Sequence, residues 1–247
     1  MNKQSDPVLK CRALKWDSDF FGFPIGKLQG RLLREKIPDV LAWSQKNRIR
    51  CLYFLCPPND LPSITSAENL GFHLVDIRCD YTAPMRQIAS PAGSIKGLQA
   101  PLRKDVPDLQ MLAATAFEDS RFNFDPQFHP KRVAEMYRLW IKKSCDGWAD
   151  KVWIIRQQGQ VTGFITCHLE EAGRAGRIGL FAVKKKFRSH GVGSSLMAAA
   201  GDYFIKKGVR QFKITTQGRN IPAQCLFAKF GLRIAAMHLW YHKWFDL

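Results

Sequence analysis

The segment from Lys184 to Ser194 is the feature that most limits how this chain can fold. It reads Lys-Lys-Lys-Phe-Arg-Ser-His-Gly-Val-Gly-Ser and lies between a strand-like run ending at Val183 and a helical pattern beginning near Val192. Glycine at 191 permits a tight turn, and glycine at 193 permits a close approach of the backbone to another group. The segment therefore predicts a strand that enters a helix through a short basic turn.

The start of such a helix is suited to binding an anion. Its first N–H groups have no partner within the helix and carry partial positive charge. With three lysines and Arg188 nearby, they form a candidate cradle for a pyrophosphate. An ordinary strand-to-helix turn has the same glycine pattern, so this segment alone leaves both interpretations open.

The elements around this turn predict an α+β domain. We expect strands and helices in the following order: strand 98–102, helices 107–117 and 131–143, strands 151–156, 161–170 and 177–183, helix 192–207, strand 211–216, helix 222–230 and strand 233–244. The short connections favour antiparallel pairing of the three consecutive strands. This order predicts helices packed on a mostly antiparallel sheet.

The end of the chain is similar to a segment in its first third. Gly71 and Gly231 are each followed by an apolar residue and a strand-like run, with tyrosine at 81 and at 241. Duplicated half-domains leave such traces, although a match this short also arises by chance. Before it we expect a strand at 28–30, a helix at 38–46 and a strand at 51–56. The stretch 83–97 is rich in proline and glycine and indicates a linker. We therefore expect a smaller, degenerate N-terminal domain at 1–82, a linker at 83–97 and a main domain at 98–247.

Composition excludes several classes of protein. Thirty-eight Lys and Arg residues against 21 Asp and Glu residues give a net charge of +17, which indicates a polyanionic partner. No recognition helix, zinc-ligand spacing or RNA-binding aromatic signature accompanies the charge, so we expect no nucleic-acid partner. Seven cysteines without a CxxC pair predict reduced thiols and no metal site. We see neither the roughly 18 apolar residues of a membrane span nor a signal peptide, and we expect a cytoplasmic protein.

Two motifs together resemble a known family. Arg188-x-x-Gly191-x-Gly193 is followed downstream by Asn220-x-x-Ala223-x-x-Leu226-Phe227-x-Lys229-x-Gly231-Leu232. Over residues 98–247 this pair is similar to the signature segments of the GNAT superfamily of N-acetyltransferases. The resemblance implies a GNAT fold, preceded here by a partial GNAT-like domain, and acetyl-CoA as cosubstrate with no metal.

The same resemblance implies the residues that bind the cosubstrate. In the family, backbone amides of the first motif hold the CoA pyrophosphate, the asparagine of the second contacts CoA, and the preceding strand edge pairs with the pantetheine arm. By position, the residues concerned are Phe181, Ala182, Val183, Arg188, Ser189, His190, Gly191, Val192, Gly193, Ser194, Asn220 and Phe227.

A narrower resemblance extends over nearly the whole chain. It is carried by 14–25, Ser120-Arg121-Phe122, Tyr137-x-x-Trp140-Ile141, Arg177-Ile-Gly-Leu180 and Thr216-Gln217. These segments look like the TDP-fucosamine acetyltransferases, which acetylate a nucleotide-linked amino-deoxy sugar for surface polysaccharides.

The acceptor-binding candidates follow from that resemblance. They are Arg121, whose guanidinium could grip phosphates in a bidentate manner, Asp17 and Gln217. Because the CoA motifs do not fix the acceptor, a protein N-terminus, a lysine and a small-molecule or drug amine stay open. A basic nucleic-acid-binding protein is a lesser alternative, and a homodimer is a candidate assembly.

One position departs from the family pattern. Phe227 stands where the family has a proton-donating tyrosine, and phenylalanine has no proton to donate. A thiolate with a solution pKa near 8.5 already leaves tolerably well. The acid could therefore be dispensable or be replaced by Tyr241, Cys225 or water; the alternative is an inactive protein that keeps its ligand-binding residues.

The base is less clearly indicated. Glu170, at the end of an expected strand, is our first candidate, acting directly or through water, and His168 competes with it. A solvated glutamate and a structural histidine are the plainer interpretations of these two residues. Alignment of two bound substrates would contribute most to the rate, and strand-edge amides near 181–183 would polarise the thioester carbonyl.

Overall fold

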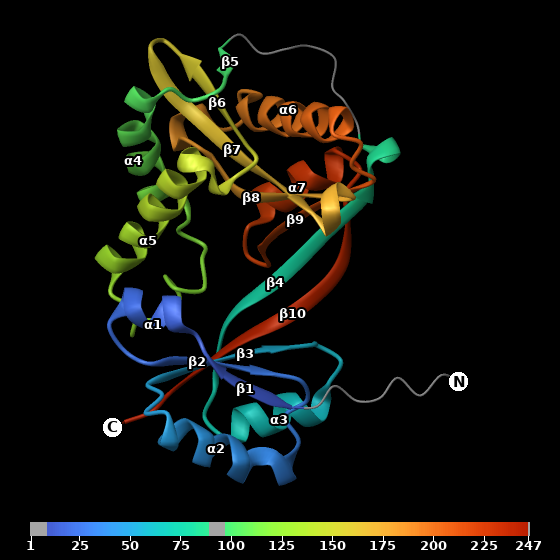
Figure 1. Ribbon diagram of the computed structural model, residues 1–247. Coiled ribbons are helices and arrows are strands. Elements are labelled where there is room, and N and C mark those ends of the chain that lie inside the picture. Colours follow the sequence, from blue (N-terminus) through green and yellow to red (C-terminus); the bar gives the residue numbers. More distant parts are fainter. Residues whose placement is uncertain (1–8, 89–96, 247) are drawn as a thin grey trace. The chain divides into compact units, whose positions relative to one another are not determined.

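The computed structural model describes residues 9–88 and 97–246 (Figure 1). The chain forms two compact units, one containing the residues up to Arg78 together with those from Met237 on, the other Cys79–Ala236. Two long strands, β4 (His73–Pro84) and β10 (Arg233–Trp244), each begin in one unit and end in the other. These units differ from the expected division at 82 and 98, because the last strand ends in the first unit. Residues 89–96 of the expected linker lie outside the described residues.

The first unit is a small mixed sheet with three helices. Its strands are β1 (Lys10–Ala13), β2 (Ile25–Gln29), β3 (Cys51–Cys56) and the end of β10. β2 pairs parallel with β3, and the other two neighbouring pairs are antiparallel. The helices are α1 (Lys15–Phe21), α2 (Ile37–Lys46) and α3 (Leu61–Asn69). Leu28, Phe54 and Tyr241 lie in the core of this unit, each almost fully buried.

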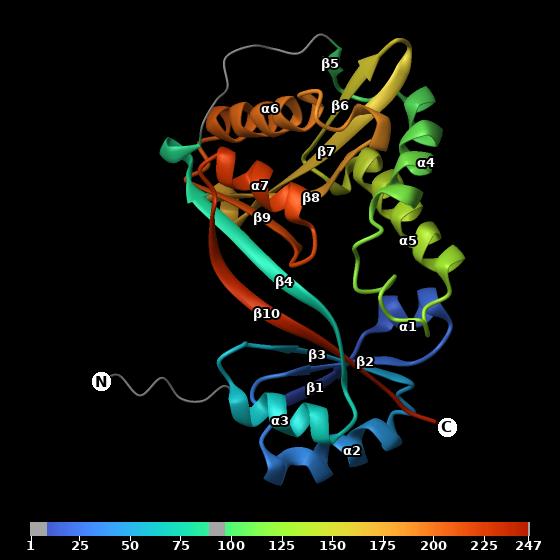
Figure 2. The same ribbon diagram turned by 180° about the vertical axis from the view of Figure 1, so that it is seen from behind.

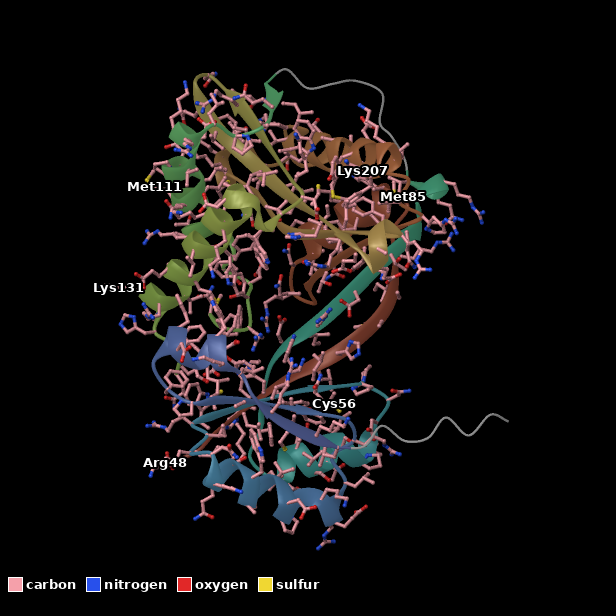
Figure 3. The ribbon with its side chains drawn as sticks, viewed as in Figure 1. Arg48, Cys56, Met85, Met111, Lys131 and Lys207 are labelled. Atoms are coloured by element: carbon pink, nitrogen blue, oxygen red, sulfur yellow. The ribbon has the colours of Figure 1, made fainter. Side chains whose placement is uncertain are left out.

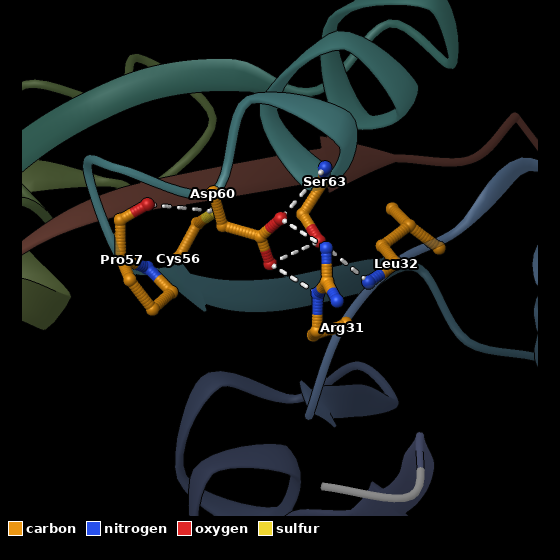
Figure 4. Close-up of polar contacts among 6 residues, drawn as sticks. All are labelled: Arg31, Leu32, Cys56, Pro57, Asp60 and Ser63. Carbon is orange, nitrogen blue, oxygen red and sulfur yellow. Dashed lines mark hydrogen bonds and ion pairs between the residues drawn. The ribbon is translucent and has the colours of Figure 1, made fainter. Parts of the chain in front are cut away.

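A polar network fixes the start of α3 (Figure 4). Asp60 is the N-cap, and its carboxylate accepts hydrogen bonds from the backbone N–H of Ser63 (3.4 Å) and from the Ser63 hydroxyl (2.7 Å). Arg31 donates to both carboxylate oxygens, at 3.2 and 3.3 Å, and Ser63 Oγ accepts from the N–H of Leu32 at 2.8 Å. Burial opposes ionisation of Asp60, but the hydrogen bonds from Ser63 and Arg31 outweigh it and lower its pKa.

The second unit has the larger sheet, in the order β4-β9-β8-β7-β6-β5. Its further strands are β5 (Leu98–Gln99), β6 (Lys151–Gln157), β7 (Gln160–Glu170), β8 (Ala175–Val183) and β9 (Gln211–Gln217). β5 to β8 pair antiparallel in sequence, and β8 pairs parallel with β9. This arrangement confirms the expected α+β class with a mostly antiparallel sheet.

Helices cover both faces of that sheet. α4 (Val106–Ala116) and α5 (Pro130–Lys143) lie side by side in both views (Figures 1 and 2), and α4 contacts β7 and β8. α6 (Val192–Lys206) packs across β6, β7 and β8, and α7 (Ile221–Lys229) follows β9. Every residue of β7 from Val161 to His168 is buried, which requires cover on both faces because side chains alternate along a strand.

The expected repeat extends over four elements. α2 and α6 end at Lys46 and Lys206; β3 and β9 begin at 51 and 211, α3 and α7 at 61 and 221, and β4 and β10 at 73 and 233. All four pairs keep the same offset in the sequence. Each copy is therefore a helix, a strand, a second helix capped by Asp60 or Asn220, and a long strand.

The long strands of the two copies are exchanged. Tyr81 of β4 packs its ring on Phe227 of α7 and donates its hydroxyl to Gln224. Tyr241 of β10 donates its hydroxyl to Glu68 of α3. Each strand thus packs on the helix of the other copy, although the sequence pattern predicts only the duplication.

Candidate functional site

The turn before α6 has the geometry of an anion-binding site. Gly191 is the N-cap residue with φ of +79°, a left-handed conformation that glycine adopts without a steric penalty. No side chain caps this helix end. The first N–H groups of α6 are therefore available to an external acceptor, and the residues present fit the pyrophosphate of acetyl-CoA.

Basic side chains surround this turn. Lys185, Lys186 and Arg188 are exposed, and Arg188 also donates to the carbonyl of Val183 at 3.3 Å. His190 Nδ1 lies 2.7 Å from the Arg188 carbonyl oxygen, which orders the tip of the turn. Lys207 lies at the opposite end of α6 (Figure 3), where a cation offsets the helix dipole and needs no ligand.

Gly193 lies where three elements meet. A Cβ atom at this position would lie 3.2 Å from Leu226 Cδ2 on α7, 3.5 Å from Phe181 Cζ and 3.8 Å from Val183 Cγ2 at the end of β8. The structure therefore brings together the two motifs and the strand end that the sequence associates with acetyl-CoA. Asn220 caps α7 by accepting from the N–H of Ala223 at 3.2 Å, a bond that uses only its side-chain oxygen.

β8 is irregular next to this turn in two ways. Its parallel ladder with β9 consists of three pairs and ends at Arg177 and Lys213, after which the strands separate. On its other edge the register with β7 shifts, so that Gly179 and Leu180 oppose the single residue Thr166. Such a β-bulge interrupts the ladder, and the N–H of Leu180 donates instead to Thr166 Oγ1 at 2.7 Å. The separated edge offers backbone groups to an extended ligand.

The two base candidates differ in their partners. The carboxylate of Glu170 accepts from Arg177 Nε, with the side chains 34% and 37% exposed, so an amine would have to compete with a guanidinium for it. His168 is buried beside the exposed indole of Trp148, with ring centroids 5.3 Å apart. Burial lowers the pKa of His168, and the positive charge of Arg177 lowers it further.

The acid candidates belong to different units. Tyr241 is part of the first unit, where burial and Glu68 raise its pKa to about 12. Cys225 is exposed on α7. Phe227 is 2% exposed, and its ring lies 5.4 Å from that of Tyr81 at an angle of 73°. The sequence analysis assigned Tyr81 no role; the signal that could have drawn attention to it is the repeat, which pairs it with Tyr241.

The loop between α4 and α5 is fastened to the start of α7. Arg219 donates to the carbonyl of Asp119 at 3.2 Å, and its guanidinium lies 3.5 Å from the centroid of the Phe124 ring. In the same loop the guanidinium of Arg121 lies 4.1 Å from the ring centroid of Phe122. Two half-buried arginines thus occupy this region, and only Arg121 was expected.

The remaining two acceptor candidates belong to different units. Gln217 ends β9, and its carbonyl accepts from Gln224 at 3.2 Å in the second unit. Asp17 lies on α1 in the first unit, and its contact with the acceptor stays a prediction. Within residues 9–88 and 97–246 no helix has the length and apolarity to cross a bilayer, and no group of three side chains is placed to hold a metal ion.

Comparison with known sequences identifies related proteins. Residues 113–232 match the model of the acetyltransferase (GNAT) family. The dTDP-fucosamine acetyltransferase of Escherichia coli O6:H1 (strain CFT073) is 27% identical over 236 residues, which cover 93% of this chain and 96% of that protein.

Solved structures share the fold. A conserved protein of unknown function from Staphylococcus epidermidis superposes with a TM-score of 0.71 at 14% identity, over 99% of this chain and 94% of the other. A GCN5-related N-acetyltransferase from Sphaerobacter thermophilus superposes with a TM-score of 0.65 at 15% identity, over 96% of this chain and 78% of the other. At these identities the structural matches bear on the fold alone.

Proposed function

We propose that this protein, an N-acetyltransferase that carries a GNAT domain at residues 113–232, acetylates the amine of a nucleotide-linked amino-deoxy sugar. The observation that supports this acceptor is the match, nearly from end to end, to an enzyme named for dTDP-fucosamine. Such sugars are precursors of surface polysaccharides. Both substrates would be polyanions, which agrees with the chain's charge of +17.

The GNAT family uses acetyl-CoA, and the second unit offers a continuous set of groups for it. In our proposal the first N–H groups of α6 hold the pyrophosphate, with Lys185, Lys186 and Arg188 adding positive charge. The separated edge of β8 at 181–183 would pair with the pantetheine amides as an added strand does. The side-chain N–H₂ group of Asn220 would donate to CoA, since its oxygen caps α7.

The acceptor side is assigned to the loop between α4 and α5. Arg121 would bind the sugar-nucleotide phosphates, for which a guanidinium has matching geometry. Arg219 would hold the loop in place through Asp119 and Phe124 and add a second positive charge. Gln217, at the end of β9, would contact the acceptor from the neighbouring strand.

The reaction would proceed by direct attack in a ternary complex. The amine nitrogen bonds to the thioester carbonyl carbon, the C–S bond breaks, and the thiolate takes the electron pair. Holding both substrates in line supplies most of the rate, and backbone N–H groups of the β8 edge stabilise the oxyanion. Tyr81, which touches Phe227, is our candidate proton donor to the thiolate; burial raises its pKa, so it stays protonated at neutral pH.

A turnover screen tests the acceptor class. Thiol release from acetyl-CoA is measured against nucleotide-linked amino sugars, the corresponding free amino sugars, peptide amines and lysine. We expect turnover with a nucleotide-linked sugar and at least tenfold lower kcat/KM with its free sugar, because the phosphates no longer bind. Turnover restricted to peptides or free amines would refute the sugar-nucleotide proposal, and no turnover at all would indicate a protein that only binds ligands.

A matched pair of variants tests the phosphate site. Arg121→Ala should raise KM for the nucleotide sugar about tenfold or more, because a charge-assisted hydrogen bond contributes roughly 1.5–3 kcal/mol. KM for acetyl-CoA should not change. Lys131→Ala removes an exposed cation from the start of α5 and serves as the control. Equal effects of both substitutions would reduce Arg121 to a general contribution to surface charge.

A further inference from the structure

His168 of β7 lies directly at the β-bulge of β8. A Cβ atom on Gly179 would overlap the His168 Nε2 atom and would lie 2.8 Å from Thr166 Oγ1. The imidazole edge therefore fills the space that any other residue at 179 would need. Gly179 itself is exposed, so the ring lies next to the surface at this irregular part of the strand.

This location coincides with the reacting end of the proposed cosubstrate path. The bulge at Gly179 and Leu180 follows the last β8–β9 pair, Arg177 with Lys213, and precedes the edge at 181–183. An extended thioester along that edge would end near the bulge. A base here would meet the acceptor amine where it attacks, whereas Glu170 lies further along β7 and is paired with Arg177.

The surroundings of His168 favour its neutral form. Burial and the positive charge of Arg177 lower its pKa; the carboxylates of Asp150 and Glu170 and a hydrogen bond with the Trp148 backbone act in the opposite direction but are outweighed. A neutral imidazole has a free lone pair and accepts a proton. At neutral pH the ring is therefore in the state that a general base requires.

We infer that His168 is the general base of the transfer reaction, accepting the proton that the acceptor amine loses as its nitrogen bonds to the thioester carbonyl carbon. The C–S bond breaks, the electron pair leaves with the thiolate, and the proton passes from the imidazole to solvent. Trp148 would shield the ring and Gly179 would leave it room. The inference rests on the acetyltransferase activity but not on the identity of the sugar, since any acceptor amine must lose a proton.

The pH profile of His168→Gln is the direct test. We expect kcat to fall about 10²- to 10⁴-fold, the usual range for loss of a general base, with KM for acetyl-CoA unchanged. In the wild-type enzyme kcat should rise with pH through one ionisation below the ordinary histidine pKa of 6.5 and then level off. In the variant that ionisation should be absent. His73→Gln, an exposed histidine at the start of β4, is the control.

Rescue separates a base from a structural histidine. Imidazole in the buffer should restore part of the activity of His168→Ala, whereas a misfolded protein would not respond. An NMR titration of the wild-type protein should assign His168 a pKa below 6.5. An unchanged pH profile in His168→Gln, or a His168 that titrates above 6.5, would overturn the inference. Turnover with a non-sugar amine would refute only the acceptor proposal and leave this test intact.

Discussion

Gly191→Glu places a carboxylate at the proposed pyrophosphate cradle. In the wild-type chain this residue is the N-cap of α6 with φ of +79°. The proposed site predicts that the substitution strongly weakens acetyl-CoA binding. Because a side chain in this conformation also strains the backbone, the effect on binding has to be separated from the effect on stability.

Gly208→Glu provides that separation. Gly208 follows the other end of α6 with φ of +69°, and a Cβ there would have no atom within 4 Å. Both substitutions incur the left-handed penalty of about 1–2 kcal/mol, less about 0.4–1 kcal/mol gained from a stiffer unfolded chain. A glutamate gains about 0.3–1 kcal/mol from the helix dipole at the N-terminus and loses as much at the C-terminus. Without ligand, Gly208→Glu should therefore be the less stable variant by about 1 kcal/mol.

For acetyl-CoA binding, Gly191→Glu should be the more damaging of the two substitutions. A carboxylate about 5 Å from one phosphate charge is repelled by roughly 3 kcal/mol at an effective dielectric constant of 20, which corresponds to about a hundredfold weaker binding. Melting temperatures with and without saturating acetyl-CoA, together with calorimetric Kd values, measure both effects. Wild-type affinity in Gly191→Glu, or an equal loss in Gly208→Glu, would show that the pyrophosphate binds elsewhere.

Four further substitutions test the hydroxyl groups and the capping network. Phe227→Tyr should leave kcat equal or raise it, and a severe loss would mean that the phenyl ring itself packs against the thioester. Tyr81→Phe and Tyr241→Phe each remove one partly buried hydrogen bond, at about 1 kcal/mol of unfolding free energy. Only Tyr81→Phe should lower kcat, and equal kcat values would exclude Tyr81 as the donor. Asp60→Asn should lose about 1–2 kcal/mol at pH 7 in urea titrations, because asparagine still caps α3 but no longer carries the charge that pairs with Arg31. The pKa of Asp60 is lower in the folded than in the unfolded state, so ionised Asp60 stabilises the fold fully above its ordinary pKa of 3.8. This stabilisation is lost as the pH falls through the lower pKa of the folded state, and the unfolding free energies of wild type and Asp60→Asn should converge there. A constant difference between the two at all pH values would contradict this.

Elements with a clear apolar period were predicted closely, and short elements held by tertiary contacts were not. The helix expected at 131–143 is Pro130–Lys143, and the strand expected at 51–56 has those bounds. α1 was missed because seven polar and aromatic residues carry no helical period; the Ser18 hydroxyl holds it by donating to Leu14 O and accepting from the N–H of Ile25. β5 is shorter than the expected 98–102 because a carboxylate of the next turn accepts from the N–H of Leu102.

In the candidate site, too, features that are local in sequence were predicted and features that depend on tertiary contacts were not. Its motif residues are local in sequence, and the structure brings Gly193 together with Phe181, Val183 and Leu226. The bulge beneath His168 was not predicted, because a register shift depends on how two strands pair. Arg219 was missed because its partner, Asp119, lies far earlier in the chain with no motif between them.

The proposed pyrophosphate site belongs to one copy of the repeat, and the two copies differ in the segment that would form it. In each copy a strand with a parallel partner is followed by a helix. In the first copy, the interval from the first paired residue of β2 to the end of α2 is Ile25 to Lys46. The matching interval of the second copy, from β8 to the end of α6, is Ala175 to Lys206 and is longer. The longer interval contains the basic turn and Gly191. In the first copy α2 instead begins at Ile37-Pro38 after Lys36, which has an ordinary helical conformation, and proline removes one of the N–H donors. The first copy still has its long strand, β4, whose end with Tyr81 belongs to the second unit. The first copy therefore contributes a strand and a hydroxyl group to that unit and no second cradle.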